Sequence, residues 1–255
     1  MNAQSASLAV EPKAAEEAET SFSRWFEVVP ASSQALLEEA YRLRYQVYCV
    51  ENPFEDPAEN PDGLETDEYD GHAVHSILVH RPTQTVSGAV RLILPDFDNP
   101  QDSLPIQKVC SEQQLQDAGP FDLAHCAEIS RFAVSKKYRR RIGEARFADV
   151  KWDEAATQNE ASRRQLPYIT LGLLRACLEM SVEHQITHVF AVMEPALIRL
   201  IRRFGLQFQL IGPLVDYHGQ RQPCVAIIKD LLKESQVHNK KFWDVGTDNG
   251  RLLLD

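Results

Sequence analysis

The stretch CAEISRFAVSKKYRRRIGEA, residues 126–145, joins a strand-like half to a strongly basic half. Residues 126–134 have the apolar content of a buried β-strand, yet Glu128 and Arg131 lie inside it. An ionised glutamate is costly in such a strand unless it is paired or lies in a wet cleft. Either surrounding shifts its pKa, which is the usual setting for a general base. The alternative is a structural ion pair between Glu128 and Arg91 or Arg131.

Side chains of a β-strand alternate between its two faces. With strict alternation, one face of the strand carries Glu128, Ser130, Phe132 and Val134. Residues 127, 129, 131 and 133 then share the other face. The pattern therefore predicts that Glu128 and Arg131 point in opposite directions.

The basic half contrasts with the whole chain, whose 255 residues carry a formal net charge of −10. That balance argues against general nucleic-acid binding, which needs a basic surface. A basic patch on an acidic protein suggests a specific anionic partner, such as a phosphate or an acidic carrier protein. A solvated basic turn is an equal alternative. The patch comprises Lys136, Lys137, Arg139, Arg140, Arg141 and Arg146.

Residues 140–145, RRIGEA, match the pattern R-x-x-G-x-A, with Gly143 as its glycine. Between a strand and a helix, this arrangement aims backbone N–H groups at an anion. The pyrophosphate of coenzyme A would suit such a nest. The start of the helix near residues 170–172 is an alternative anion site.

Outside this stretch, the sequence predicts helices and strands that share one sheet. We expect helices over residues 33–48, 170–182 and 195–204, and strands over 72–80, 85–94, 187–193, 207–210 and 224–228. The short link at residues 81–84 makes the first two strands an antiparallel hairpin. Residues 51–63 form a long loop rich in proline and acid, and residues 146–166 a polar excursion. The fold class is α/β, with a mixed sheet flanked by helices.

The ends of the chain differ in composition from the middle. We expect a disordered extension over residues 1–21, one domain over residues 22–235 and a polar tail over residues 236–255. The N-terminus lacks the features of a secretory signal, and no apolar run approaches the length of a membrane span. Five scattered cysteines without C-x-x-C spacing argue against a metal site and fit a reducing cytoplasm. Cys126 and Cys177 are expected to be buried thiols.

A dense acidic cluster, ETDEYD at residues 65–70, precedes the strand at residues 72–80. Such a cluster binds a cation or an ammonium group, or pairs with arginines such as Arg44 and Arg91. A solvated acidic loop is the common alternative. The cluster lacks the pattern of a calcium-binding loop.

Four motifs in one order resemble a known family. They are RYQVY at 44–48, similar to R-x-x-V-F; ETDEYD at 65–70, similar to E-x-D-x-Y-D; GAVRL at 88–92, similar to G-x-x-R-L; and EISRFAV at 128–134, similar to E-x-S-R-F-x-V. Over about residues 35–230 the chain resembles the N-acyl-homoserine-lactone synthases and the related N-acyl amino acid synthases. It looks closest to the acyltransferases associated with bacterial PEP-CTERM/exosortase systems. The resemblance implies a fold of the Gcn5-related N-acetyltransferase (GNAT) type, with a mostly antiparallel sheet.

The resemblance also implies a reaction, in which a long-chain acyl group moves from a thioester to an amine. The strands at 126–134 and 187–193 would splay apart, and the acyl–pantetheine arm would thread the gap. Glu128 would take the proton of the attacking amine, directly or through water. Backbone N–H groups of the splayed strand would stabilise the oxyanion. No bound cofactor is implied; the thioester of an acyl carrier protein or of coenzyme A is a co-substrate.

The same resemblance assigns two sets of binding residues. The amine substrate would be held, and the cleft ordered, by Arg44, Asp67, Asp70, Arg91, Ser130, Arg131 and Phe132, with Phe132 lining the acyl path. The carrier or pantetheine arm would meet Val134, Lys136, Lys137, Arg139, Arg140, Arg141 and Gly143.

The loop ENPFEDP, residues 51–57, lacks the tryptophan that lactone synthases usually carry. This departure favours an amino acid acceptor over S-adenosylmethionine. Two alternatives stay open: a lactone synthase that uses S-adenosylmethionine, and a non-catalytic module that binds an acyl carrier. The acyl chain length, the choice between carrier protein and coenzyme A, and the oligomeric state are left undetermined.

Overall fold

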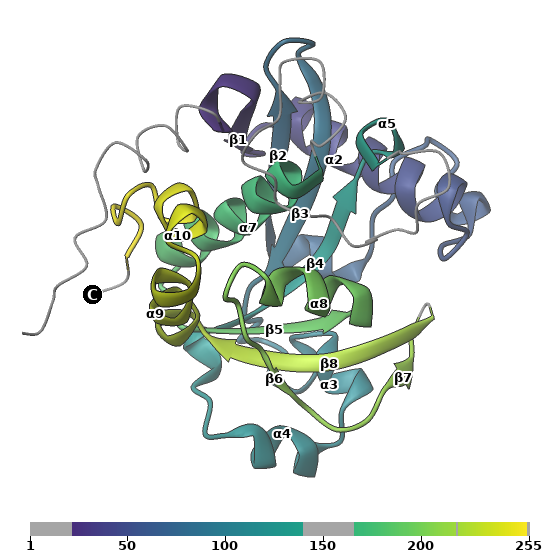
Figure 1. The fold of residues 1–255 in the computed structure, drawn as a ribbon. Coiled ribbons are helices and arrows are strands. Elements are labelled where there is room, and N and C mark those ends of the chain that lie inside the picture. The colour runs from purple at the N-terminus through teal and green to yellow at the C-terminus, as the bar shows by residue number, and fades with distance from the viewer. Residues whose placement is uncertain (1–21, 140–165, 218, 254–255) are drawn as a thin grey trace, which may run out of the picture.

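One mixed sheet organises the computed structural model (Figure 1). The structure describes residues 22–139, 166–217 and 219–253. Its strands follow the spatial order β1-β2-β3-β4-β5-β8-β6, with β7 paired to β8. Every pairing is antiparallel except that of β4 with β5, so the expected mixed, mostly antiparallel sheet is confirmed. The strands are β1 (Phe26–Pro30), β2 (Ala73–His80), β3 (Thr85–Ile93), β4 (Cys126–Val134), β5 (His188–Met193), β6 (Gln209–Leu210), β7 (Val215–Asp216) and β8 (Gln220–Ile227).

Helices occupy most of the connections between these strands. They are α2 (Gln34–Tyr45), α3 (Ile106–Val109), α4 (Glu112–Ala118), α5 (Lys136–Arg139), α7 (Leu166–Glu183), α8 (Pro195–Arg202), α9 (Ile228–His238) and α10 (Lys240–Gly246). Ser33 caps α2, because its hydroxyl accepts a hydrogen bond from the backbone N–H of Leu36 at 3.4 Å. A π-helical turn, Gln46–Glu51, prolongs α2 into the long loop. The positive φ of Gly205 (+82°) follows the end of α8, as expected of a C-terminal glycine.

The sheet buries both of its faces against helices. On one face Ala40 and Leu43 of α2 pack on Ile77 of β2, and on the other face α7 packs on Leu78, the next residue of β2. Consecutive residues of β2 thus pack on opposite faces of the sheet, because side chains of a strand alternate between its two faces. None of the helices described is long and apolar enough to cross a membrane.

Three parts of the fold differ from the prediction. Strand β1 was not expected, because five residues with a half-buried pattern give little periodic signal. Strand β8 begins at Gln220, four residues before the strand expected over residues 224–228, because its first two residues pair with β7 and residues 222–227 pair with β5. The segment predicted as a C-terminal tail contributes α10, whose Phe242 and Val245 lie in the main core.

Strands β4 and β5 run side by side and then separate. Their parallel ladder joins Cys126–Ile129 to residues 188–191 and ends there, while β5 continues beside β8 as far as Met193. The second half of β4 remains paired to β3 alone. This arrangement leaves a V-shaped opening in the middle of the sheet, as the resemblance implied.

A β-bulge in β4 breaks the strict alternation predicted from the sequence. Ser130 pairs with Arg91, and Ala133 pairs with Ala89. Between these two pairs β4 advances by three residues while β3 advances by two. The extra residue is Arg131, whose φ of +48° costs a non-glycine residue about 1–3 kcal/mol. Arg131 therefore shares the face of Ser130, and Phe132 turns to the α7 side. The prediction that Glu128 and Arg131 face opposite ways was wrong for this reason.

Candidate active site

Three arginines from three different elements, two of them buried, meet the acidic cluster of residues 65–70. Arg44 projects from α2 and is 1% exposed. Its Nε donates to Glu65 at 2.5 Å, and its two terminal nitrogens donate to the two oxygens of Asp70 at 2.7 and 3.0 Å. This fork-to-fork geometry is the strongest arrangement for an arginine and a carboxylate. The alternative of a solvated acidic loop is excluded for these residues.

Arg91 of β3 connects the acidic cluster to β4. Its terminal nitrogens donate to the two oxygens of Asp67 at 2.5 and 2.9 Å, and one of them also donates to Asp70 at 2.8 Å. Its Nε donates to the hydroxyl of Ser130 at 2.9 Å. Asp67 and Asp70 hold the helical turn Glu68–His72 through a capping box, so the loop and the network fix each other.

Arg131 joins the network from the bulge. It donates to Glu65 through Nε and Nη2, to Glu55 through Nη2 at 2.9 Å, and approaches Asp67 at 3.0 Å. These three carboxylates offset the strained backbone of Arg131. Its guanidinium also lies over the ring of Tyr48, with 5.4 Å between Cζ and the ring centroid.

The network changes the pKa values of its members. Burial would raise the pKa of Glu65, but the charges of Arg44 and Arg131 outweigh that effect and hold the pKa below its ordinary value. The pKa of Asp67 is likewise lowered, since the hydrogen bonds and charge of Arg91 outweigh burial. The pKa of Arg131 is raised because its acidic neighbours outweigh burial. The ion pairs thus remain charged over the physiological pH range.

Glu128 has a different environment, although it lies only two residues along β4 from Ser130, the partner of Arg91. Its side chain is 2% exposed, and its Oε2 accepts a hydrogen bond of 2.7 Å from the backbone N–H of Ile106. Burial raises its pKa to about 7, against the lowering effects of that hydrogen bond and of the charge on Arg91. Among the described residues it makes no ion pair with Arg91 or Arg131, so the structural ion pair considered from sequence is not observed. A carboxyl group with this pKa exchanges protons near neutral pH.

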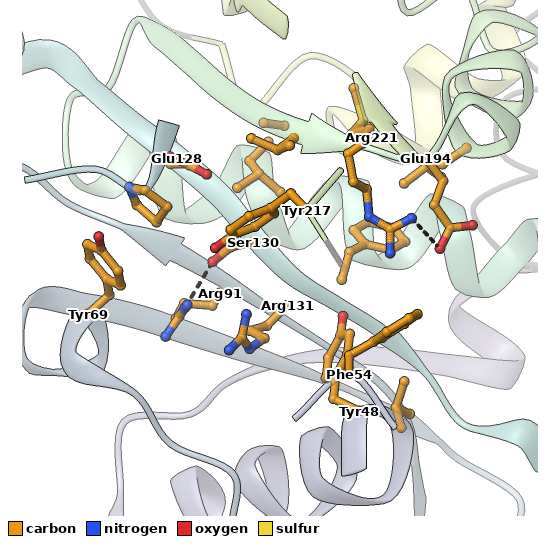
Figure 2. Close-up of a pocket in the computed structure, with 18 of the residues that line it drawn as sticks. Tyr48, Phe54, Tyr69, Arg91, Glu128, Ser130, Arg131, Glu194, Tyr217 and Arg221 are labelled. Carbon is orange, nitrogen blue, oxygen red and sulfur yellow. Dashed lines mark hydrogen bonds and ion pairs between the residues drawn. The ribbon is translucent and has the colours of Figure 1, made fainter. Parts of the chain in front are cut away.

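A cavity of about 160 Å³ opens where β4 and β5 separate. Glu128, Ser130 and Arg131 lie along its β4 wall, with Asp67 and Arg91 beside them. The opposite side is formed by Tyr217, Glu194 and Arg221, and the guanidinium of Arg221 lies toward Phe54 (Figure 2). Phe132 and Val134 complete the β4 wall.

A second, apolar cavity lies next to the first. The two share Ile129, Leu174 and Phe208 as lining residues. Its remaining wall comes from the apolar faces of α7, α9 and α10 and from β5. The one hydroxyl in that wall, of Ser181, donates to the carbonyl of Cys177 and is therefore satisfied. A concave surface of this kind suits a hydrocarbon chain.

The structure brings most of the predicted site residues together. Asp67, Arg91, Glu128, Ser130, Arg131, Phe132 and Val134 line the cavity. Arg44 and Asp70 are bonded behind this wall and support it. Lys136 and Lys137 are exposed on α5, directly after β4. Arg139 is the last residue of α5. The described residues do not include Arg140, Arg141 and Gly143. They include the predicted polar excursion only at its last residue, where α7 begins.

Sequence reasoning missed several residues of the site. Phe54 and Glu55 lie in the long proline-rich loop, Glu194 precedes α8, and Tyr217 and Arg221 lie in the supposed connector. None was assigned a role, because only the tertiary structure brings the loop after α2, the start of α8 and the hairpin of β7 and β8 to one cavity. Glu65 was quoted with the acidic cluster but not given a role. No group of three or more potential metal ligands occurs among the described residues.

Comparisons with known proteins match the chain to one domain family, one relative and several solved structures. The acetyltransferase (GNAT) domain family matches residues 43–148. An acyl-homoserine-lactone synthase of Aliivibrio fischeri is 29% identical over 170 residues, which cover 67% of this chain and 73% of that protein. The structure of BjaI, a CoA-dependent acyl-homoserine lactone synthase with SAM and isopentyl-CoA, matches with a TM-score of 0.55 at 19% identity over 89% of each chain. FeeM, an N-acyl amino acid synthase from uncultured soil microbes, matches with a TM-score of 0.50 at 14% identity over 84% of this chain and 97% of its own.

Residues 43–148 thus match a GNAT domain, the fold resembles that of solved acyl-homoserine lactone synthases, and the homologues of this chain are acyltransferases. Within that class, the chain is a homologue of acyl-homoserine-lactone synthase, and an N-acyl amino acid synthase is among its structural neighbours. The resemblance seen in the four motifs is therefore confirmed. The likeness to the PEP-CTERM/exosortase branch stays a prediction.

Proposed function

We propose that this acyltransferase moves a long-chain acyl group from a carrier-protein or coenzyme A thioester to the amine of an amino acid or similar small molecule. One observation carries the proposal: Glu128, with a pKa raised to about 7, lines the cavity at the point where β4 and β5 separate. A group of that pKa is suited to accept the proton of an attacking amine at neutral pH.

The reaction needs one proton transfer in each direction. The amine nitrogen attacks the thioester carbonyl and forms the C–N bond, while its proton passes to Glu128, directly or through water. The tetrahedral oxyanion then collapses, the C–S bond breaks, and the thiolate regains a proton from Glu128. The free edge of β4 beyond Ile129 offers backbone N–H groups to the oxyanion. The products are an amide and a free thiol.

The acyl chain would extend into the apolar cavity. Ile129, Leu174 and Phe208 line both cavities, so a chain that starts at the thioester passes between them toward α9 and α10. Burying methylene groups there contributes about 0.8 kcal/mol each, which favours long chains over short ones.

The basic turn after β4 supports an acidic carrier protein as donor. Lys136 and Lys137 are exposed on α5 next to the end of the β4 wall. Reversing both charges to glutamate should raise KM for an acyl-carrier substrate several-fold and leave a short acyl-pantetheine thioester nearly unaffected. Equal effects on the two donors would count against docking at α5.

A lactone synthase remains a second candidate, because the curated relative from Aliivibrio fischeri has that activity. Mass spectrometry of lipid extracts from bacteria that express the full chain separates the two. An N-acyl amine that disappears with Glu128→Gln and persists with the exposed control Glu59→Gln supports the proposal. An N-acyl-homoserine lactone as the new product supports the second candidate. A product that is equally abundant with Glu128→Gln refutes the role of the base.

A further inference from the structure

A guanidinium on the wall of the cavity opposite the β4 residues has most of its hydrogen-bonding capacity unused. Arg221 of β8 forms an ion pair between its Nη1 and Glu194 Oε1 at 2.9 Å (Figure 2). Its Cζ lies 5.6 Å from the centroid of the Phe54 ring. Within the described part of the chain, its Nε and Nη2 have no hydrogen-bond partner. The side chain is 13% exposed and lines the same cavity as Glu128.

The position of Arg221 is fixed from two directions. Glu194 precedes α8 and holds one edge of the guanidinium, while Phe54 covers it from the loop after α2. An arginine held in this way presents its remaining donors in a fixed fork, which matches the geometry of a carboxylate. Arg131 adds to this preference, since its Nη1 also has no hydrogen-bond partner among the described residues and it lines the same cavity.

Arg221 forms no ion pair with the network around the acidic cluster among the described residues. The three arginines of that network already pair with Glu55, Glu65, Asp67 and Asp70. Arg221 instead pairs with Glu194 and lies next to Phe54, neither of which belongs to the network. Its free donors are therefore available to a ligand.

We propose that Arg221, oriented by Glu194 and Phe54, binds the carboxylate of the acceptor, so that the enzyme selects amines that carry a free carboxylate. This inference rests on the proposed function and narrows its acceptor class. It distinguishes amino acids from their amides, esters and decarboxylated amines. Glycine is the smallest member of that class and fits any pocket built for a larger one.

Product analogues test this without requiring turnover. The probes are N-dodecanoylglycine and N-dodecanoylglycinamide, with their Kd for the full chain measured by calorimetry. The wild-type protein should bind the carboxylate roughly tenfold or more tightly than the amide, as a hydrogen bond to a charged group predicts. Arg221→Gln should remove the difference, and Arg221→Lys should restore part of it. Arg199→Gln, which removes an exposed charge on the neighbouring α8, should leave it unchanged.

The outcomes separate this inference from the proposed function. The inference is overturned if Arg221→Gln keeps the wild-type melting temperature and still prefers the carboxylate probe. It is also overturned if the wild type binds both probes equally. If Arg221→Gln unfolds the protein, Arg221→Lys is the deciding variant. A preference for the carboxylate probe as large as that of the wild type would overturn the bidentate role of the guanidinium. A smaller preference supports that role. Glu128→Gln should abolish transfer and keep the preference. Carboxylate-selective binding without transfer to any amine refutes the proposed function alone.

Discussion

Replacing Glu128 with glutamine tests whether burial sets the pKa of this carboxyl group. The pKa rises from an ordinary value of 4.5 to about 7 because the group is fully enclosed. A difference of one pKa unit corresponds to about 1.36 kcal/mol, so the ionised form costs the folded protein about 3 kcal/mol. Glutamine has nearly the same shape and never ionises, and it therefore avoids that cost.

The sign of the pH dependence follows from proton binding. Between pH 4.5 and 7 the folded protein keeps a proton on Glu128 that the unfolded chain has lost. The free energy of unfolding of the wild type therefore falls as pH rises through this window, relative to Glu128→Gln. Between pH 4 and pH 8 the free energy of unfolding of the variant should rise by about 3 kcal/mol relative to that of the wild type. That gain equals roughly 6–12 °C in melting temperature for a chain of this size.

Urea denaturation of both proteins at constant ionic strength, at steps from pH 4 to pH 8, measures this difference. All other carboxyl groups are common to both and cancel. Glu59→Gln, on an exposed turn, is the matched control. Its difference from the wild type in free energy of unfolding should not change with pH. A flat difference for Glu128→Gln as well would refute the argument from burial. Activity gives a second readout, because the variant should lose about 10²–10⁴-fold in kcat/KM, together with the part of the pH profile governed by a pKa of about 7.

Two further predictions concern the scaffold of the site. Arg44→Ala leaves two buried carboxylates without their partner and should cost about 3–5 kcal/mol in urea denaturation; Arg42→Ala, on the exposed side of the same helix, should cost less than about 1 kcal/mol. A similar loss for both would mean that the network does not stabilise the fold. Gly172→Ala places a Cβ 2.6 Å from Leu78 Cδ1 and should destabilise by about 1–3 kcal/mol, whereas Gly71→Ala meets nothing within 4 Å. Equal melting temperatures for these two variants would contradict the tight packing of α7 on β2.

The acidic motif shows how far local sequence leads. Its carboxylates were expected either to pair with Arg44 and Arg91 or to remain solvated, and sequence could not choose between the two. The choice depends on α2, β3 and the turn Glu68–His72 meeting in space, since an ion pair across 26 residues leaves no local signal. Likewise, alternation along β4 holds as far as Ser130 and fails at Arg131, because a bulge depends on the register with β3.

The sequence by itself determined the class of fold, the splayed pair of central strands through the four motifs, and Glu128 as the candidate base. The class of fold follows from periodicity, whereas the splayed strands and the role of Glu128 are implied by the family resemblance that the four motifs carry. Tertiary structure alone decided that Arg131 turns toward the acidic cluster, that Glu128 is buried without an ion pair, and that Arg221, Glu194 and Phe54 meet at the cavity. Each of these depends on strand register or on segments far apart in the chain, and the energies of burial and pairing are defined only once those segments are in contact.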